Sequence, residues 1–485
     1  MGKILYFLCF ILSVLPHRCK RESKAYSWNL LERQGNEVFT PFSYRLNKQD
    51  KDMKRILTFL LVAFATIVAH AQEGAWSGEL DLGGTKLPLV FHFDAEGCTM
   101  DSPSQGAKGI KALKSYTPEG KIKVEIPMIG ASFEGLVVMK MITGTFTQGG
   151  ASLPLTLKPG EVKPNRPQTP KAPFPYTTEE VTFKSQDSPT EEFTLHGTIT
   201  MPEGCTKETP ALVMVTGSGQ QNRDEEMMDH KPFAVIADAL AREGIATLRF
   251  DDRGYNEASF PFLDFTVANH KNDAAAAVSV LRQRFNKVGV IGHSEGGTIV
   301  LMLASEGMVD FGVSLAGMAV SGKETLLEQK RTILSAAGLA NDIVSDYCNA
   351  LSEAFDDMAA HKPTKDVVIS TVPAVLKANF EATLHLLSSR YMRDFLNVDI
   401  RGVLPNIKCP ILALNGKKDT QVNSTSNLDA IDKGLVNSRH ETVEFDNLNH
   451  LFQHCQTGLF TEYQQIEETF ASEALTKICT WIKSL

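Results

Sequence analysis

The sequence predicts an α/β fold with a doubly wound, mostly parallel sheet, preceded by a small all-β domain. Two patterns support this prediction. From residue 178 onward, short continuous apolar runs that end in glycine or charged residues alternate with helical stretches, which is typical of buried parallel strands joined by helices. Before residue 158, apolar and polar residues alternate in short stretches separated by turn residues, which is typical of antiparallel strands.

Residues 72–158 are expected to form a small antiparallel sandwich or barrel. The stretch "KLPLVFHF" places Leu87, Leu89, Phe91 and Phe93 on one face, and "KIKVEIP" repeats the pattern. This region has no recognisable catalytic constellation. Docking, substrate access and a purely structural role are all open for it.

A proline-rich stretch separates the two regions. It reads "KPGEVKPNRPQTPKAPFPY", and its six prolines favour stiff, extended backbone. We place a linker at residues 159–177 and a catalytic domain at residues 178–485.

The N-terminus contains two apolar runs, and the second has the form of a secretory signal peptide. The stretch "MKRILTFLLVAFATIVAHAQ" begins with a basic pair and ends in small residues, and its apolar run is short for a membrane span. We predict a signal peptide at residues 53–71, a mature chain that begins at Gln72, and a secreted or periplasmic protein without a stable membrane anchor. A membrane anchor is the alternative. Residues 1–52 are expected to be an upstream extension from a start codon assigned too early.

The charge and the cysteines argue against other classes of protein. The net charge of -8 does not suit a nucleic-acid binder, which needs a basic face. The six cysteines after Gln72 are scattered singly and form no CxxC pair. They are expected to be mostly buried free thiols.

A serine between glycines stands at the end of one predicted strand. The stretch "VGVIGHSEGG" contains Ser294, and a helix is expected to begin at about Glu295. Glycines flank a nucleophilic serine at such a turn because larger neighbouring side chains would clash. A serine that only caps the helix is the alternative.

Two later strand ends supply the partners that a nucleophilic serine needs, in the order acid and then histidine. The stretch "CPILALNGKKDTQV" places Asp419 just past a strand, and "HETVEFDNLNHLFQH" places His450 in the loop after the next strand. His454 is the second candidate for the base. A solvated turn residue is the alternative for Asp419. His293 is excluded because it is expected to point away.

These motifs together resemble a known family. The stretches "GSGQQNRDEE", "FDDRG", "GHSEGG", "LNGKKDTQV" and "LNHLFQH" are similar to those of the secreted bacterial α/β-hydrolase family of serine esterases, which is related to serine aminopeptidase and prolyl oligopeptidase catalytic domains. The resemblance covers about residues 178–485. It implies an α/β-hydrolase fold with Ser294 as nucleophile, His450 as base and Asp419 as acid.

Two backbone N–H groups are expected to stabilise the oxyanion. One belongs to Glu295, directly after the nucleophile, and the other to Ser218, with Gly219 as the alternative. The family usually has His and Gly before this position, whereas this chain has Thr216 and Gly217.

The expected reaction is hydrolysis of a small-molecule carboxylic ester through an acyl-enzyme. The reaction needs no metal or organic cofactor. An exported serine peptidase or amidase on the same triad is the alternative, and a non-catalytic binding protein is a third. The natural ester and the oligomeric state are left open by the sequence.

Residues 318–409 are too many for one crossover and contain amphipathic helices. They are expected to form a helical cap over the serine, and a simple extension of the core is the alternative.

The remaining charged residues near the strand ends are expected to form ion pairs that hold loops. These residues are Asp251, Asp252, Arg253, Arg223, Asp224 and Glu225. The Glu295 side chain is expected to sit at a helix N-terminus without a catalytic duty, and binding of a substrate amine is its alternative role.

Overall fold

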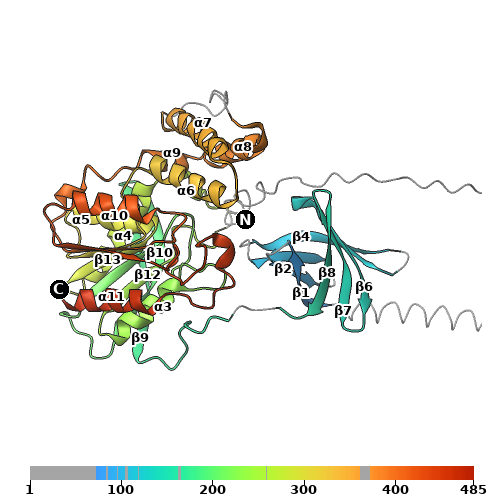
Figure 1. The fold of residues 1–485 in the computed structure, drawn as a ribbon. Coiled ribbons are helices and arrows are strands. Elements are labelled where there is room, and N and C mark those ends of the chain that lie inside the picture. Colours follow the sequence, from blue (N-terminus) through green and yellow to red (C-terminus); the bar gives the residue numbers. More distant parts are fainter. Residues whose placement is uncertain are drawn as a thin grey trace, which may run out of the picture. The chain divides into compact units, whose positions relative to one another are not determined.

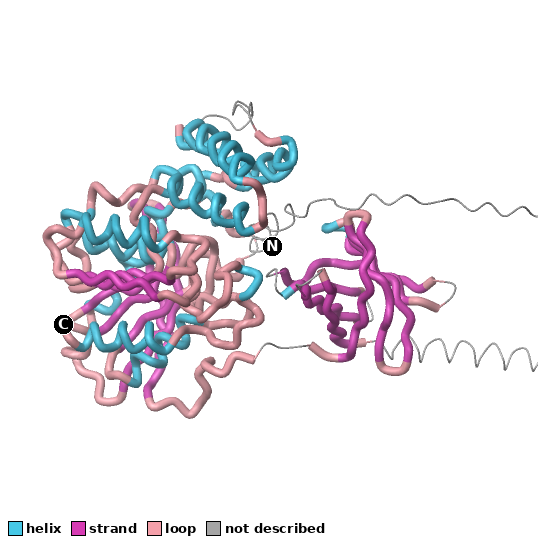
Figure 2. Tube along the Cα trace, in the orientation of Figure 1, coloured by secondary structure: helices cyan, strands magenta, loops and turns pink. Residues whose placement is uncertain are grey.

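The computed structural model describes eight stretches of the chain: residues 73–82, 86–94, 97–103, 107–117, 120–161, 165–257, 259–360 and 372–485. The predictions for residues 1–52 and 53–71 lie outside them. The described chain forms two compact units (Figures 1 and 2).

The first unit is a closed barrel whose strands follow one another along the chain. The last strand pairs antiparallel with the first, so the barrel leaves no open sheet edge. The strands are β1 (Gly74–Asp81), β2 (Lys86–Phe93), β3 (Cys98–Ser102), β4 (Ala107–Tyr116), β5 (Ile122–Ile126), β6 (Ala131–Val138), β7 (Met141–Gln148) and β8 (Ala151–Pro159). The predicted all-β unit is confirmed, and of the two expected architectures it is the barrel.

Aromatic and aliphatic side chains fill the barrel interior. Phe91 and Phe133 are fully buried, with ring centroids 5.6 Å apart, and Phe93 is 2% exposed. Ile122 and Val124 on β5 are also fully buried. The alternating faces predicted for β2 and β5 therefore produce a packed core.

The second unit is built on an eight-stranded sheet in the order β16-β15-β14-β13-β11-β12-β10-β9. Its strands are β9 (Tyr176–Ser188), β10 (Glu191–Pro202), β11 (Ala211–Val215), β12 (Ala246–Phe250), β13 (Val288–His293), β14 (Gly312–Leu315), β15 (Ile411–Gly416) and β16 (His440–Phe445). Strands β9 and β10 are antiparallel, and β11 to β16 are parallel. Every residue of β11, β13, β14 and β15 is buried, which explains their continuous apolar runs.

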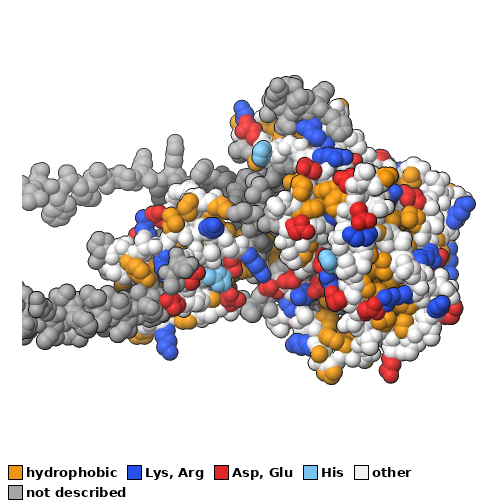
Figure 3. Space-filling view, turned by 180° about the vertical axis from the view of Figure 1, so that it is seen from behind, with side chains coloured by type: hydrophobic (Ala, Val, Ile, Leu, Met, Phe, Trp, Pro, Cys, Tyr) orange, Lys and Arg blue, Asp and Glu red, His pale blue; other side chains and the backbone are white. Residues whose placement is uncertain are grey.

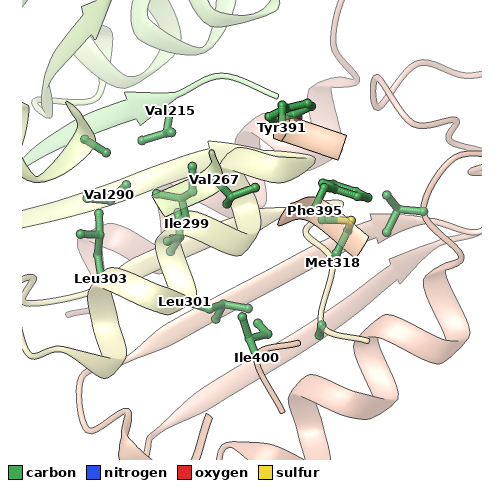
Figure 4. Close-up of a cluster of buried hydrophobic side chains, with 14 of the residues drawn as sticks. Val215, Val267, Val290, Ile299, Leu301, Leu303, Met318, Tyr391, Phe395 and Ile400 are labelled. Atoms are coloured by element: carbon green, nitrogen blue, oxygen red, sulfur yellow. The ribbon is translucent and has the colours of Figure 1, made fainter. Parts of the chain in front are cut away.

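Helices cover both faces of this sheet (Figure 1). Helices α3 (Pro232–Arg242) and α11 (Ser472–Lys483) lie on one face. Helices α4 (Val267–Arg282), α5 (Glu295–Ser305) and α10 (Ser424–Gly434) lie on the other. Because side chains alternate along a strand, Leu212 of β11 packs with the first group and Val215 with the second. Figure 4 shows Val215 in this second core with Ile299 and Leu301 of α5.

Among the described residues between β14 and β15, within the predicted insertion, there are four α-helices. They are α6 (Gly322–Ala336), α7 (Asn341–Ala359), α8 (Lys377–Leu386) and α9 (Arg390–Asn397). Tyr347, Phe355 and Phe380 are fully buried and belong to the same apolar cluster as β11 and β13. The insertion therefore extends the main core in addition to any role above the serine. None of the helices in the described residues is long and apolar enough to span a membrane.

Residues 165–175 of the proline-rich stretch belong to the second unit. The guanidinium of Arg166 donates to three carbonyl oxygens. They belong to Met228 at 2.8 Å, Gln464 at 2.9 Å and Ile466 at 2.8 Å. The Gln168 amide donates to the carbonyl of Phe470 at 2.7 Å. This segment is thus fixed by side-chain hydrogen bonds although its backbone forms no regular element.

The cysteines and the surface charges match the sequence in part. The six described cysteines are free thiols, as predicted, but only Cys98, Cys348 and Cys479 are buried. On the face shown in Figure 3, acidic and basic side chains are interspersed over the larger unit. Surface ion pairs such as that of Arg282 with Asp310 join opposite charges of this unit.

Candidate active site

Ser294 occupies a strained turn between β13 and α5. Its backbone has φ 55° and ψ -118°, a conformation that side-chain-bearing residues rarely adopt. Its N–H donates to the carbonyl of Leu315 at 2.8 Å, and its carbonyl accepts from Gly297 at 2.9 Å. Its side chain makes no capping hydrogen bond to the helix. The residue therefore stands where a nucleophile elbow places its serine, and the helix-capping alternative is not supported.

The glycines around Ser294 are required by close packing of the backbone. A Cβ atom on Gly292 would lie 2.2 Å from the carbonyl oxygen of Gly296. One on Gly296 would lie 2.1 Å from the carbonyl oxygen of Val215. The steric reason that the sequence gives for these glycines therefore agrees with the structure.

Asp419 and His450 form a buried pair. The His450 Nδ1 lies 2.7 Å from the Asp419 Oδ2, and the side chains are 4% and 0% exposed. The other carboxylate oxygen accepts the N–H groups of Gln421 at 2.7 Å and Val422 at 2.9 Å. Asp419 is thus not a solvated turn residue. Because Nδ1 donates to the carboxylate, Nε2 of a neutral ring is left as the proton acceptor.

His454, the second candidate for the base, lies in a surface cluster. Its two ring nitrogens are within 2.8 and 2.9 Å of Glu468 and Glu473, and half of the side chain is exposed. The hydrogen bond to Glu468 raises its pKa. The geometry therefore favours His450 as the base.

The His293 ring makes two hydrogen bonds that the sequence does not predict. Its Nε2 lies 2.8 Å from the carbonyl oxygen of His450, and its Nδ1 lies 2.9 Å from the Glu225 Oε1. A carbonyl and an ionised carboxylate only accept hydrogen bonds, so both ring nitrogens donate and the ring is an imidazolium. Burial alone would lower the pKa of His293, but Glu225 and the His450 carbonyl outweigh it and raise the pKa. The ring thereby joins the base to the strand that carries Ser294.

Glu225 also holds the loop that follows β11. The same Oε1 that faces His293 accepts the N–H of Gly217 at 2.8 Å. A Cβ atom on Gly217 would lie 3.1 Å from the Cβ of Ser294, so this loop lies directly against the nucleophile. The ion pair predicted for Glu225 therefore exists, but its partner is a histidine beside the nucleophile.

The other predicted ion pairs hold loops as expected, with one exception. Arg223 binds Asp251 through two nitrogens, Arg249 binds Asp224, and Arg253 binds Asp187 and Asp273. Asp252 is the exception. It accepts hydrogen bonds from the Thr216 hydroxyl at 2.8 Å and the Gln221 N–H at 2.5 Å, and burial raises its pKa to about 7.

The two predicted oxyanion donors belong to different elements. Glu295 begins α5, and Ser218 follows Gly217 in the loop after β11. Within the described residues, the N–H groups of both make no hydrogen bond to other parts of the chain. The same holds for Gly219, so the choice between Ser218 and Gly219 stays a prediction.

The Glu295 side chain is turned into the protein. It is 1% exposed, and its carboxylate binds the Ser218 hydroxyl at 3.0 Å, the His270 Nδ1 at 3.1 Å and the Tyr391 hydroxyl. The carboxylate is therefore closed to a substrate ammonium group. The cavity beside it, lined in part by Asp252 and His270, has a volume of about 10 Å³, too small for an acyl group.

A comparison with models of known protein families agrees with this fold. The model of the alpha/beta hydrolase family matches residues 212–457, and the chain belongs to this family. The matched residues include Ser294, Asp419 and His450.

One curated relative is Esterase EstD of Thermotoga maritima. It is 27% identical over 259 residues, which are 53% of this chain and 58% of the relative. The chain thus spans about 58% of the length of that relative.

Several solved structures are similar to this chain. Est1E from Butyrivibrio proteoclasticus has 15% identity and a TM-score of 0.36, over 63% of this chain and 99% of that chain. The Pyrococcus furiosus esterase Pf2001 has 16% identity and a TM-score of 0.41, over 67% and 98%. Proline iminopeptidase from Mycobacterium smegmatis has 13% identity and a TM-score of 0.38, over 63% and 98%.

Proposed function

We propose that the protein is a serine hydrolase that cleaves carboxylic esters, with Ser294 as nucleophile, His450 as base and Asp419 as the acid that orients it. The observation that carries the proposal is the buried pair of Asp419 and His450, joined through His293 to the strand end that carries the strained Ser294. Membership of the alpha/beta hydrolase family and the similarity to an esterase support it.

In this mechanism each group acts in turn. His450 Nε2 takes the hydroxyl proton as Ser294 attacks the acyl carbon, and the Asp419 carboxylate stabilises the imidazolium that forms. The N–H groups of Glu295 and Ser218 donate to the oxyanion, and loss of one such donor costs about 10²- to 10³-fold in kcat in comparable enzymes. The protonated His450 then gives its proton to the leaving alcohol, and water releases the acyl group by the same steps.

The proposal is tested with a series of p-nitrophenyl esters and aminoacyl p-nitroanilides. We expect ester turnover that falls by roughly 10³-fold or more in Ser294→Ala, as loss of a triad member does elsewhere. The matched control is Ser305→Ala at the C-terminal end of α5, which removes a serine hydroxyl that donates to the Met302 carbonyl at 2.7 Å and should leave turnover unchanged. Ester turnover that survives in Ser294→Ala would contradict the nucleophile. Anilide cleavage at rates comparable to those of esters would favour a peptidase or amidase.

We also propose that the protein is exported and that its signal peptide is residues 53–71. The basic pair, the apolar run and the small residues before Gln72 support this proposal. Expression of the full chain in a bacterial host and intact mass measurement of the exported protein test it. The expected N-terminus is Gln72, and a product that retains Met53 would contradict the cleavage site.

A further inference from the structure

The Glu295 carboxylate joins three separate parts of the second unit. Ser218 belongs to the loop after β11, His270 to α4 and Tyr391 to α9 of the helical insertion. All three side chains contact a carboxylate that is 1% exposed. An ionised carboxylate only accepts hydrogen bonds, so the Ser218 and Tyr391 hydroxyls and the His270 Nδ1 all donate to it.

Tyr391 is held firmly in this position. It is 2% exposed, and its ring packs 5.8 Å from the His270 ring and 6.1 Å from the Phe262 ring, between centroids. Asp394, on the same helix, accepts the N–H of Val267 at the start of α4 at 3.2 Å. Figure 4 shows Tyr391 and Phe395 of α9 in the cluster of buried side chains that also contains Val267 of α4. Helix α9 thus bridges the insertion and the sheet unit.

These hydrogen bonds to Glu295 include one from Ser218, whose backbone N–H is a proposed oxyanion donor. The Ser218 hydroxyl and the Ser218 N–H belong to one residue, so the hydrogen bond from that hydroxyl to Glu295 restricts how the N–H is oriented. The Tyr391 hydroxyl donates to the same carboxylate oxygen, Glu295 Oε2, as the Ser218 hydroxyl does. Charge-assisted hydrogen bonds in a buried site are strong, so loss of one donor releases the carboxylate toward its other partners.

We propose that Tyr391 is a positioning residue for the loop after β11, which carries Ser218. Tyr391 acts through Glu295, and it couples the position of the helical insertion to the orientation of Ser218. This inference rests on the proposed function. It implies that an insertion displaced from α4 leaves the Ser294–His450–Asp419 set intact but stabilises the oxyanion less well. Tyr391 touches no reacting atom in this scheme.

The test compares two tyrosine-to-phenylalanine variants of the full chain. Tyr391→Phe removes only the hydroxyl that meets Glu295. Tyr347→Phe is the matched control, because Tyr347 is a fully buried tyrosine of the same insertion whose hydroxyl donates to the Asn379 Oδ1 at 2.6 Å. Both variants lose one buried hydroxyl from the insertion, but only Tyr391→Phe alters the link to Ser218.

The readouts are kcat and KM for a p-nitrophenyl ester and the affinity for a trifluoromethyl ketone, which forms a tetrahedral adduct with a nucleophilic serine. For Tyr391→Phe we expect kcat to fall roughly tenfold, as small misplacements of catalytic groups do, with KM little changed and inhibitor affinity weakened by a similar factor. Tyr347→Phe should keep kcat and inhibitor affinity close to wild type. Ser218→Ala, which removes the other end of the link without altering the insertion, should show the same pattern as Tyr391→Phe.

Three results would overturn the inference. They are equal kcat values for the two tyrosine variants, a change in KM without a change in kcat for Tyr391→Phe, and additive losses in the variant that combines Tyr391→Phe with Ser218→Ala. Each of these results counts against the inference only when the wild-type enzyme hydrolyses the ester and Ser294→Ala does not. Absence of that turnover in the wild type would instead contradict the proposed function.

Discussion

Two buried pairs of a glutamate and a histidine stand on either side of Ser294, and they differ in what they connect. Glu225 and His293 connect the loop after β11, the nucleophile strand and the backbone of His450. Glu295 and His270 connect the same loop to α4 and, through Tyr391, to the insertion.

The difference shows which side of the site is fixed and which can respond to the insertion. Both ring nitrogens of His293 have hydrogen-bond partners outside the insertion, namely Glu225 and the carbonyl of His450. The Nε2 of His270 is buried and has no hydrogen-bond partner within the described residues. Burial alone would lower the pKa of His270, but the bond to Glu295 outweighs it and raises the pKa. We infer that the first pair fixes the base, and that the second transmits the position of α9.

The largest expected effect is that of Glu225→Gln. One oxygen accepts both Gly217 and His293, so a neutral amide leaves a buried imidazolium without its counter-charge. We expect a loss of about 3–5 kcal/mol in the free energy of unfolding, as for other buried pairs that lose one partner. Urea denaturation measures it. The control is Glu226→Gln, at the next position. Its carboxylate lies 3.6 Å from the Lys231 Nζ and 3.4 Å from the Asn222 Nδ2, so the substitution should change stability by less than about 1 kcal/mol.

Removal of both members of the first pair sharpens this result. In the variant that combines Glu225→Gln with His293→Gln, no buried charge is left unpaired, so part of the lost stability should return. Equal or greater destabilisation of the combined variant would contradict the assignment of His293 as an imidazolium.

The pH dependence of His293 is the next expected effect. Its pKa in the folded chain is raised above its ordinary value of 6.5, so its contribution to stability is complete below that value and is lost as the pH rises through the raised pKa. The difference in unfolding free energy between wild type and His293→Gln should therefore shrink on going from acidic to alkaline pH. Urea denaturation at a series of pH values measures it, and a difference that grows with pH would reverse the assignment.

Glu295→Gln should have a smaller effect than Glu225→Gln. Two of its three partners are hydroxyls, which can turn to accept hydrogen bonds from an amide, so we expect a loss of about 1–2 kcal/mol. The same denaturation experiment measures both glutamine variants. A larger loss at Glu295 than at Glu225 would contradict the proposed difference between the pairs.

The smallest expected effect is that of His454→Ala. Its ion pairs with Glu468 and Glu473 are exposed, so we expect a change of less than about 0.5–1 kcal/mol and unchanged kcat. Ester hydrolysis by His454→Ala and His450→Ala, measured side by side, checks this. Loss of activity in His454→Ala alone would transfer the role of the base to His454.

The fold was largely predictable because it follows from local patterns. The buried parallel strands appear as apolar runs, and the barrel strands as alternation. Ser294, Asp419 and His450 were predicted as a set because each follows a strand in an order that the chain displays, and their catalytic roles stay a proposal. The structure supports their proximity through the Asp419–His450 bond and the contact of His293 with His450.

The two glutamate–histidine pairs could not be predicted in this way. Glu225 and His293 are 68 residues apart, and Glu295 lies 25 residues from His270 and 96 from Tyr391, so no periodic pattern links them. The sequence shows Glu225 as one charge in an acidic loop and Tyr391 as one aromatic residue on an amphipathic helix. Their partners are set by the crossing of α4, α9 and the loop after β11, which only the folded chain reveals.

The most direct test of the central claim is titration of the purified protein with p-nitrophenyl diethyl phosphate, followed by peptide mass mapping. This compound phosphorylates an activated serine and releases p-nitrophenol. The account predicts one diethyl phosphoryl group per chain, located on Ser294, with loss of ester hydrolysis in proportion to labelling and no labelling in Ser294→Ala. Inactivation with the phosphoryl group on another residue, or full ester hydrolysis with Ser294 labelled, would contradict it.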